Sequence, residues 1–358
     1  MLRNYMLAAV LWSSLTLAAM VFAQDQPEII AGSKGFTMKS SDGDFQLRIR
    51  THLQVDGRLY SSDNNDARAN SFIIRRNRIF LQSTLYKYLD FKVMPDFGQG
   101  RTELFDAYFD IRFAPSVIVR FGKTKVPFGL ELLQSPLDFL FIERSLVNNL
   151  VPNRDIGVQL YGELAKGAVG YQVSVSNGVT DLARGDTDES DSKDITARLT
   201  FDSFRPGTIA ALKGLSAGIA ITTGNRAGTN AAPNLPNYRS PGQVTVFRYL
   251  SDSTAAGTAV ASGSNIRVSP QSYYHWGPFG LLGEYVRSSH EVAIGTSLTK
   301  LEHAAWQVAG SFLLTGDNAS FKTVEPKQIF DPEAGTWGAF EITARISQLI
   351  SMTTRSPS

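Results

Sequence analysis

Arginine and lysine side chains recur at alternate positions in the first 125 residues of this 358-residue chain, and they are the groups best suited to chemistry. A guanidinium donates two parallel hydrogen bonds to phosphate or carboxylate oxygens, so a series of them along one surface offers successive weak sites to a moving anion. The candidate anion-path residues are Arg48, Arg50, Arg58, Arg76, Arg78, Arg112, Arg120, Lys123 and Lys125, with hydroxyl donors from Tyr60 and Tyr108.

In an alternative interpretation these cations form ion pairs with carboxylates on the same surface and have a structural role. The carboxylates concerned are Asp56, Asp106, Asp110, Glu131 and Glu143. Residues 45–125 carry fourteen Lys or Arg against eight Asp or Glu, although the whole chain has a net charge of only +2. Charge that lines a path acts on the ions that pass along it, so this local excess of basic residues favours net attraction of anions.

Other kinds of chemistry have little support in the sequence. The four histidines, at 52, 275, 290 and 303, lack metal-ligand spacing, and no Ser/His/Asp order stands out. The acidic run 186–191 lacks the glycine and the distal glutamate that complete a calcium loop. We therefore expect no enzyme activity, no cofactor, no metal and no nucleic-acid partner.

The basic residues are positioned by strands, and the clearest strand is FQLRIRTHLQVDGRLY at 45–60. Apolar and polar residues alternate there with a period of two over a length unusual for a soluble sheet. One face is apolar and the other is rich in arginine. A transmembrane barrel, with lipid on one face and a wet lumen on the other, suits this pattern better than a soluble sandwich.

Further segments alternate in the same way along the chain. Thirteen strands are predicted in all, at 45–60, 71–85, 89–94, 104–113, 117–125, 156–164, 168–177, 194–203, 214–224, 265–276, 279–290, 300–314 and 338–350. Turns such as 165–167 and 277–278 are short, whereas the connections 178–193 and 225–264 are long and polar. Such asymmetry is typical of periplasmic turns and outward loops, and the fold class predicted is an all-β transmembrane antiparallel barrel.

The segment 127–155 does not alternate. It mixes apolar residues with Glu131, Asp138, Glu143 and Arg144 and is too long for a tight turn. Long ordered loops are usually functional, and one this apolar is expected to be buried. Inside a barrel the place to bury it is the lumen.

The N-terminus predicts export. Arg3 supplies a positive charge, residues 6–22 are apolar or small, and Val21-Phe22-Ala23 suits signal peptidase. We expect a cleaved signal peptide at 1–23 and a periplasmic lead-in at 24–44; an uncleaved anchor helix is the alternative, but the apolar run is short for a span. The absence of cysteine agrees with an oxidising compartment.

Several blocks in order resemble the phosphate-selective porin O and P family. They include LRIRTHLQVDGRLY, FIIRRNRIFLQSTL, ELFDAYFDIRF, VRFGKTKVPFGLELLQS, FIERS, NRDIGVQLYGEL, LPNYRSPG, SPQSYYHWGPFGLLGEYV, AWQVAGSFLLTGD and GAFEITARIS. The likeness covers roughly residues 45–350, which is far more specific than one short motif.

The resemblance implies a sixteen-stranded outer-membrane barrel, usually a homotrimer, whose third outward loop forms a constriction and whose basic lumen draws small, phosphate-like anions. In this chain the barrel would span 45–350, the constriction loop would be 127–155, and 351–358 would be an atypical tail. Thirteen strands fall short of sixteen, so we expect a chain truncated at its C-terminus. A non-selective general porin, or a structural or adhesive barrel that does not conduct, remain as alternatives.

Overall fold

The computed structural model describes residues 26–32, 35–60, 70–188, 191–202 and 209–351. The chain divides into two compact units, Met1–Thr102 and Glu103–Ser358, and each is described by itself. The expected signal peptide, and the expected tail apart from Ser351, lie outside the described residues. Among the residues that are described, no helix has the length and apolar character needed to cross a bilayer.

The first unit is an antiparallel meander in which each strand pairs with the next. Its strands are β1 (Glu28–Gly32), β2 (Gly35–Lys39), β3 (Gln46–Arg58), β4 (Ser71–Leu85) and β5 (Leu89–Asp96), followed by a short 3-10 helix, η1 (Gly98–Gly100). β1 and β2 lie in the region expected to be only a lead-in. Five residues are too few for a period to be recognised, and β2 forms because it pairs with β3, Phe36 opposite Ile49.

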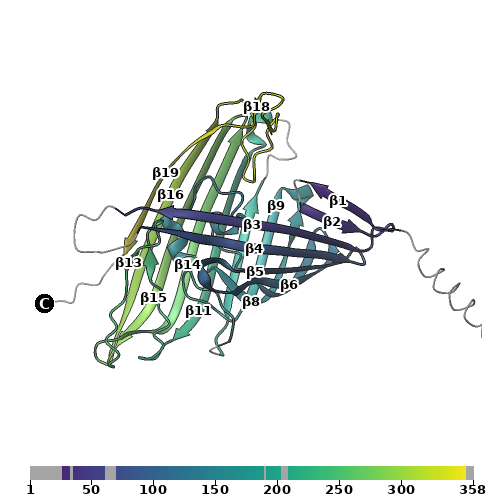
Figure 1. Ribbon diagram of the computed structural model, residues 1–358. Coiled ribbons are helices and arrows are strands. Elements are labelled where there is room, and N and C mark those ends of the chain that lie inside the picture. The colour runs from purple at the N-terminus through teal and green to yellow at the C-terminus, as the bar shows by residue number, and fades with distance from the viewer. Residues whose placement is uncertain (1–25, 33–34, 61–69, 189–190, 203–208, 352–358) are drawn as a thin grey trace, which may run out of the picture. The chain divides into compact units, whose positions relative to one another are not determined.

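The second unit is also a meander, of ten strands in consecutive antiparallel pairs. They are β6 (Glu103–Ala114), β7 (Val117–Lys125), β8 (Arg154–Leu164), β9 (Val169–Ser176), β10 (Asp194–Phe201), β11 (Leu215–Ala227), β14 (Ala259–Trp276), β15 (Phe279–Ile294), β16 (Ser297–Leu313) and β19 (Glu341–Ser351). Figure 1 shows the long strands β14, β15, β16 and β19 side by side. With β3, β4 and β5 these ten account for all thirteen predicted strands, and the all-β class is confirmed.

Shorter elements occupy the connections of the second unit. Two hairpins, β12 (Tyr238–Arg239) with β13 (Thr245–Phe247) and β17 (Phe330–Asp331) with β18 (Thr336–Trp337), stand apart from the meander. The described helices here are α2 (Leu130–Leu133), η2 (Leu146–Leu150), η3 (Ala165–Gly167) and η4 (Ala210–Leu212). None exceeds five residues, so strands dominate the described chain.

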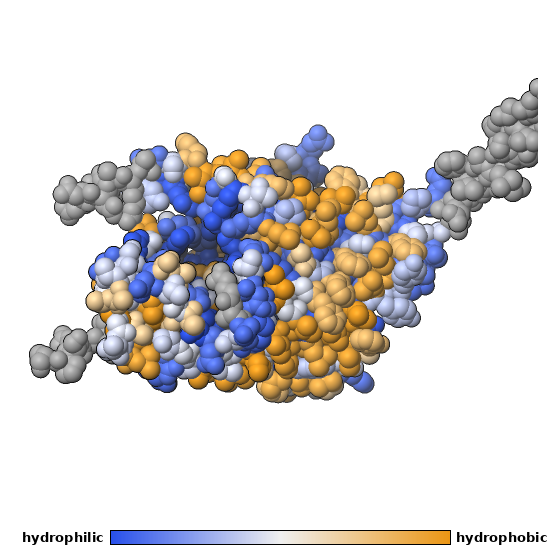
Figure 2. Space-filling model, turned by 90° about the horizontal axis from the view of Figure 1, so that it is seen from below, coloured by the Kyte–Doolittle hydropathy of each residue, from blue (hydrophilic) through white to orange (hydrophobic). Residues whose placement is uncertain are grey.

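The two faces of each meander are the reverse of those in a water-soluble sheet. In β11 the exposed residues Ile219 and Ile221 alternate with Ala220 and Thr222, which are 1% and 0% exposed. We call the face of Ile219 and Ile221 the outward face and the other the inner face. Figure 2 shows apolar side chains gathered in wide areas of the surface. Apolar side chains outside and polar ones inside suit lipid on one face and water on the other.

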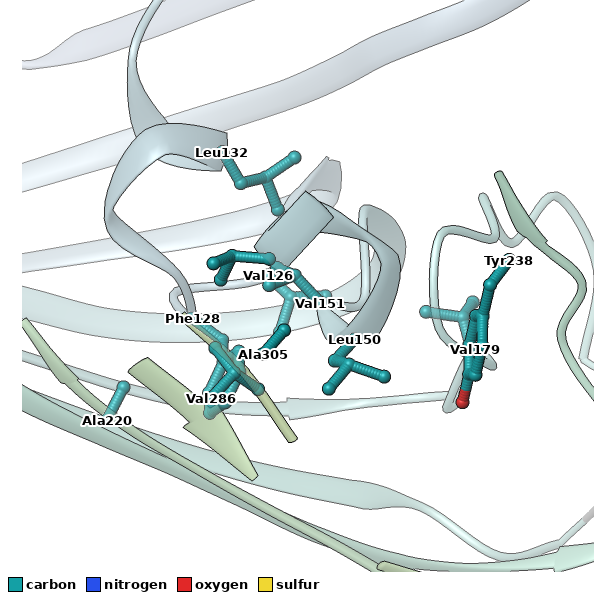
Figure 3. Close-up of a cluster of buried hydrophobic side chains, with 11 residues drawn as sticks. Val126, Phe128, Leu132, Leu150, Val151, Val179, Ala220, Tyr238, Val286 and Ala305 are labelled. Atoms are coloured by element: carbon teal, nitrogen blue, oxygen red, sulfur yellow. The ribbon is translucent and has the colours of Figure 1, made fainter. Parts of the chain in front are cut away.

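The apolar core lies on the inner face of the second unit, where residues 126–151, here named the inward segment, pack against the strands. Phe128 of this segment is fully buried against Val286 of β15 and Ala305 of β16, which Figure 3 shows close together. Ala220 of β11 belongs to the same cluster. Full burial of one such large side chain stabilises the fold by about 1.5–3 kcal/mol, which fixes the segment on the wall.

Candidate functional site

A band of polar side chains crosses the inner face of the second unit. Cross-strand register places its members side by side from β9 to β16: Ser174, Thr196, Thr222, Arg267, Ser288 and His303. All six are at most 3% exposed. Polar groups buried in this way are costly unless polar partners face them. The covering segments supply partners for Arg267, Ser288 and His303, whereas the hydroxyls of Ser174, Thr196 and Thr222 have none among the described residues.

The connection 177–193, between β9 and β10, supplies one partner in Asp181. Nε of Arg267 donates to Oδ1 of Asp181 over 2.5 Å, and Nε2 of His290 lies 3.1 Å from Oδ2. Burial by itself would raise the pKa of Asp181, but the charges of Arg267 and His290 and their hydrogen bonds hold that pKa below its usual value. Asp181 therefore fastens the connection to the wall as an anion.

The connection that carries the hairpin β12–β13 covers the same place. The hydroxyl of Tyr238, which is fully buried, donates to Oδ2 of Asp181 over 3.3 Å. Asn149 of the inward segment pairs with the backbone of Arg239: its Nδ2 donates to the carbonyl over 2.8 Å, and its Oδ1 accepts from the amide over 2.7 Å. Three segments distant in sequence thus meet over the polar band.

Two buried carboxyl groups, Glu284 of β15 and Glu131 of the inward segment, join the segment to the strands. Glu284 of β15 accepts from the amides of Leu130 and Glu131, over 2.6 and 3.3 Å. Nε2 of Gln307 lies within hydrogen-bond distance of both carboxylates, 3.2 Å from Glu131 and 3.3 Å from Glu284. Hydrogen bonds contribute about 0.5–1.5 kcal/mol each to stability, so together these contacts fix α2 in place.

The connection 314–340, between β16 and β19, approaches the inward segment from the other end of the strands. The ring of Phe321 stacks on Tyr273 of β14 with 4.4 Å between centroids and 11° between planes. Oγ1 of Thr323 donates to Oδ1 of Asp138 over 2.6 Å. Connections from both ends of the strands therefore cover the inner face of the second unit.

Six of the predicted anion-path residues lie in the first unit: Arg48, Arg50, Arg58, Arg76, Arg78 and Tyr60. Nε of Arg78 donates to Oδ2 of Asp96 over 2.7 Å, and both side chains are nearly buried. Arg58 lies 3.8 Å from Asp56. Arg50 donates a hydrogen bond to Gln82, and Arg76 donates one to Gln54. Two of these arginines are thus neutralised by a neighbouring carboxylate.

The other five lie in the second unit: Tyr108, Arg112, Arg120, Lys123 and Lys125. Arg120 donates to both oxygens of Asp110, over 2.7 and 2.8 Å, and lies 3.8 Å above the ring of Tyr108. Lys123 forms an ion pair with Asp186, and Nζ of Lys125 donates to the carbonyl of Gln134 over 2.7 Å. Arg120 and Lys123 are thus paired with carboxylates, as the alternative interpretation of a structural role predicts.

The four predicted constriction residues all lie in the inward segment, and three of them make contacts that hold its shape. Oε1 of Glu131 accepts from Nη1 of Arg345 over 3.2 Å, and the carbonyl of Glu143 accepts from the same nitrogen over 3.0 Å. Arg144 donates to backbone carbonyls of the segment, that of Glu131 among them at 3.2 Å. Asp138 meets Thr323 as described above.

Arg198 of β10 is a functional candidate that the sequence analysis missed. Nε and Nη2 donate to Oε1 of Gln271 over 3.3 and 3.1 Å, and Nη1 donates to Oε1 of Gln172 over 3.2 Å. Within the described part of the chain these neutral amides are its hydrogen-bond partners, and no carboxylate forms an ion pair with it. Arg198 is partly exposed and lies on the inner face of β10, opposite the exposed Ile195 and Leu199.

A sequence signal for Arg198 exists. In DITARLTF, the apolar residues Ile195, Ala197 and Leu199 alternate with Thr196 and Arg198, which places the arginine on the inner face. The same alternation applies to arginines in β14 and β19 that were also overlooked. Their partners could not be found in this way, because Asp181 and Glu131 come from connections that do not alternate.

The histidines serve the polar band as hydrogen-bond partners. Nε2 of His303 lies 2.8 Å from the hydroxyl of Tyr249, and Nδ1 lies 3.1 Å from that of Ser351. Nδ1 of His290 lies 2.9 Å from Nδ2 of Asn265. Over the ranges that the structure describes, no group of three His, Cys, Asp or Glu is arranged to hold a metal ion.

Comparison with known proteins gives one family and several solved structures. The model of the family described as phosphate-selective porin O and P matches residues 45–351. The outer-membrane channel DcaP of Acinetobacter baumannii is 15% identical, with a TM-score of 0.49, 79% of this chain covered and 78% of that one. An anion-selective porin from Comamonas acidovorans is 11% identical, with a TM-score of 0.45 and 75% of each chain covered. No curated protein sequence matches.

Proposed function

The chain belongs to the phosphate-selective porin O and P family, and on that premise we propose that it conducts small, phosphate-like anions across the outer membrane. The family makes the chain an outer-membrane porin. The inner face carries the polar groups that a water-filled path needs, and the outward face carries the apolar side chains that suit lipid.

The observation that carries the anion preference is the charge state of the inner face around Arg198. Arg120, Lys123, Arg154 and Arg267 each have a carboxylate partner, so each pair contributes little net field to the lumen. Arg198 donates to the side-chain oxygens of Gln172 and Gln271, which do not neutralise it, and makes no ion pair among the described residues. The carboxyl groups of Glu284 and Asp202 are its electrostatic neighbours. A partly exposed guanidinium of this kind attracts anions and can bind phosphate oxygens in pairs.

The test is a measurement of reversal potential in planar bilayers under a gradient of potassium chloride. We expect wild-type channels to favour chloride, Arg198→Gln to lose much of that preference, and Arg198→Glu to favour potassium. The double variant Asp110→Asn with Arg120→Gln is the control, because it removes a pair of zero net charge and should leave selectivity unchanged. No anion preference in the wild type would point to a general porin instead, and equal effects of both changes would show that Arg198 does not set the preference.

Phosphate preference needs its own measurement. If Arg198 binds phosphate, millimolar phosphate should reduce chloride current through wild-type channels and reduce it less through Arg198→Gln channels. Absence of any ion current would support the remaining alternative, a structural or adhesive outer-membrane protein.

The proposed assembly and maturation are checked separately. We propose a homotrimer in outer-membrane lipid, exported by a signal peptide cleaved after Ala23. Cross-linking of the membrane-embedded protein would give a trimer, and N-terminal sequencing of the mature protein would begin at Gln24.

A further inference from the structure

The connection 314–340 displays large apolar side chains outside the strands. Phe330 of β17 and Trp337 of β18 are cross-strand partners, 61% and 71% exposed, with 6.0 Å between ring centroids. Ile329 beside them is 71% exposed. Exposed aromatic and aliphatic residues gathered on one hairpin are uncommon in water and indicate an interaction surface.

Hydrogen bonds fix the shape of the hairpin, and one of its two sides is polar. Oδ1 of Asp331, where the turn begins, accepts from the amides of Glu333 and Ala334 over 2.9 and 3.1 Å. Oγ1 of Thr336 donates to the carbonyl of Ile329 over 2.6 Å. Asp331 and Thr336 face each other across the hairpin, as Phe330 and Trp337 do, so polar and aromatic pairs alternate.

The apolar side chains continue the outward face of the strands. Phe279 of β15, Phe312 of β16 and Ile342 of β19 lie in one cross-strand row, all exposed. The amide of Leu314 donates to the carbonyl of Phe340 over 2.8 Å. These two residues form the next row, in which Leu314 is 58% and Phe340 52% exposed. Only Gly338 and Ala339 separate Phe340 from Trp337, so no charged residue interrupts the apolar path.

The end of the meander that carries this connection holds most of the short turns: 115–116, 165–168 and 277–278 lie there, whereas 295–296 is a short turn of the opposite edge. When the strands of the second unit are numbered in their order of pairing from β6, the connections 115–116, 277–278 and 314–340 each join an odd strand to the next even one. In an antiparallel meander such connections all lie at the same edge. Short turns mark the periplasmic side of outer-membrane proteins.

We propose that the hairpin Phe330–Trp337 lies in the headgroup boundary of the inner leaflet and anchors the periplasmic rim to phospholipid. Amphipathic aromatic rings are favoured at that depth, and Asp331 and Thr336 on the alternate side would face water. Lipid rather than a protein partner is indicated because the apolar surface is continuous with the lipid-facing row. The inference rests on the proposed membrane location and does not depend on ion selectivity.

The absence of cysteine allows a clean test by single-cysteine labelling. Trp337→Cys and the control Glu333→Cys, at the exposed turn of the same hairpin, are each labelled with bimane in the full chain. Both are reconstituted in phosphatidylethanolamine and phosphatidylglycerol vesicles with a nitroxide near the headgroup. We expect blue-shifted emission and about twofold stronger quenching at 337 than at 333.

Equal quenching of both positions by aqueous iodide, with no effect of the nitroxide lipid, would overturn the proposal and assign the surface to a protein partner. A second measurement avoids labelling: the variant Trp276→Phe, Trp306→Phe keeps Trp337 as the single tryptophan of a mature protein that begins at Gln24. Brominated phospholipid should quench that emission, and unchanged emission would contradict the lipid contact. Neither readout uses conductance, so failure of the anchor is distinct from failure of anion conduction.

Discussion

Arg267 of β14 and Asp181 of the connection 177–193 form an ion pair of 2.5 Å in which both side chains are fully buried. The pair joins the polar band of the sheet to a segment far away in sequence. Burying two charges is costly, and the cost is offset only while each charge keeps its partner.

Asp181→Asn should therefore destabilise the protein strongly. Removal of one member of a buried ion pair leaves an uncompensated charge and lowers the free energy of unfolding by about 3–5 kcal/mol. Urea unfolding in detergent micelles measures it. Asp188→Asn is the matched control, because Asp188 pairs with Lys193 where both are exposed, and its loss should cost less than about 1 kcal/mol. Equal losses in the two variants would show that Asp181 is not a fastening point.

Stability should also fall in acid through the same carboxylate. The pKa of Asp181 in the folded protein lies below its usual 3.8, so ionisation stabilises the fold at every pH above that value. The contribution is lost as the pH falls below about 4, toward the folded pKa. Unfolding measured between pH 6 and pH 3 should show a steeper loss in the wild type than in Asp181→Asn, and parallel curves would contradict this assignment.

Phe321→Ala should loosen the contact between the connection 314–340 and the inward segment. Stacking on Tyr273 contributes about 0.5–1.5 kcal/mol beyond the burial of area, so stability should fall by at least that amount. Single-channel conductance should rise because the segment no longer narrows the lumen. Lys322→Gln, at an exposed neighbouring position, is the control for stability. Unchanged conductance together with lost stability would mean that Phe321 only braces the wall.

The outward face contains an ion pair between Arg287 and Glu302, 2.5 Å apart on β15 and β16. Glu302→Leu would leave an unpaired arginine against lipid, which costs about 2–4 kcal/mol at the bilayer centre and about 0–1 near its surface. The double variant Arg287→Leu with Glu302→Leu should be more stable than the single variant, because it leaves no charge behind. Heat-induced unfolding in lipid vesicles compares them, and the reverse order would place the pair in water.

Much of the fold could be predicted from local sequence. Side chains in a strand alternate between faces whatever lies around them, so the sixteen residues at 45–60 predict β3 and the pattern at 117–125 predicts β7. β1 and β2 were missed because five residues carry too little alternation. The same rule places Arg198 on the inner face of β10, because it alternates with the apolar residues of 194–201.

The sequence by itself determined which faces are apolar and which carry charge, because the period of two is a local property of the chain. Only the tertiary structure decided which basic side chains are neutralised by a carboxylate partner and which keep a net charge. Arg120 meets Asp110 through the register of β6 and β7, and Arg267 meets Asp181 through a connection that folds inward. Ion pairing depends on distances of a few ångströms between residues remote in sequence, so the excess of basic residues counted along the chain does not give the charge of the path.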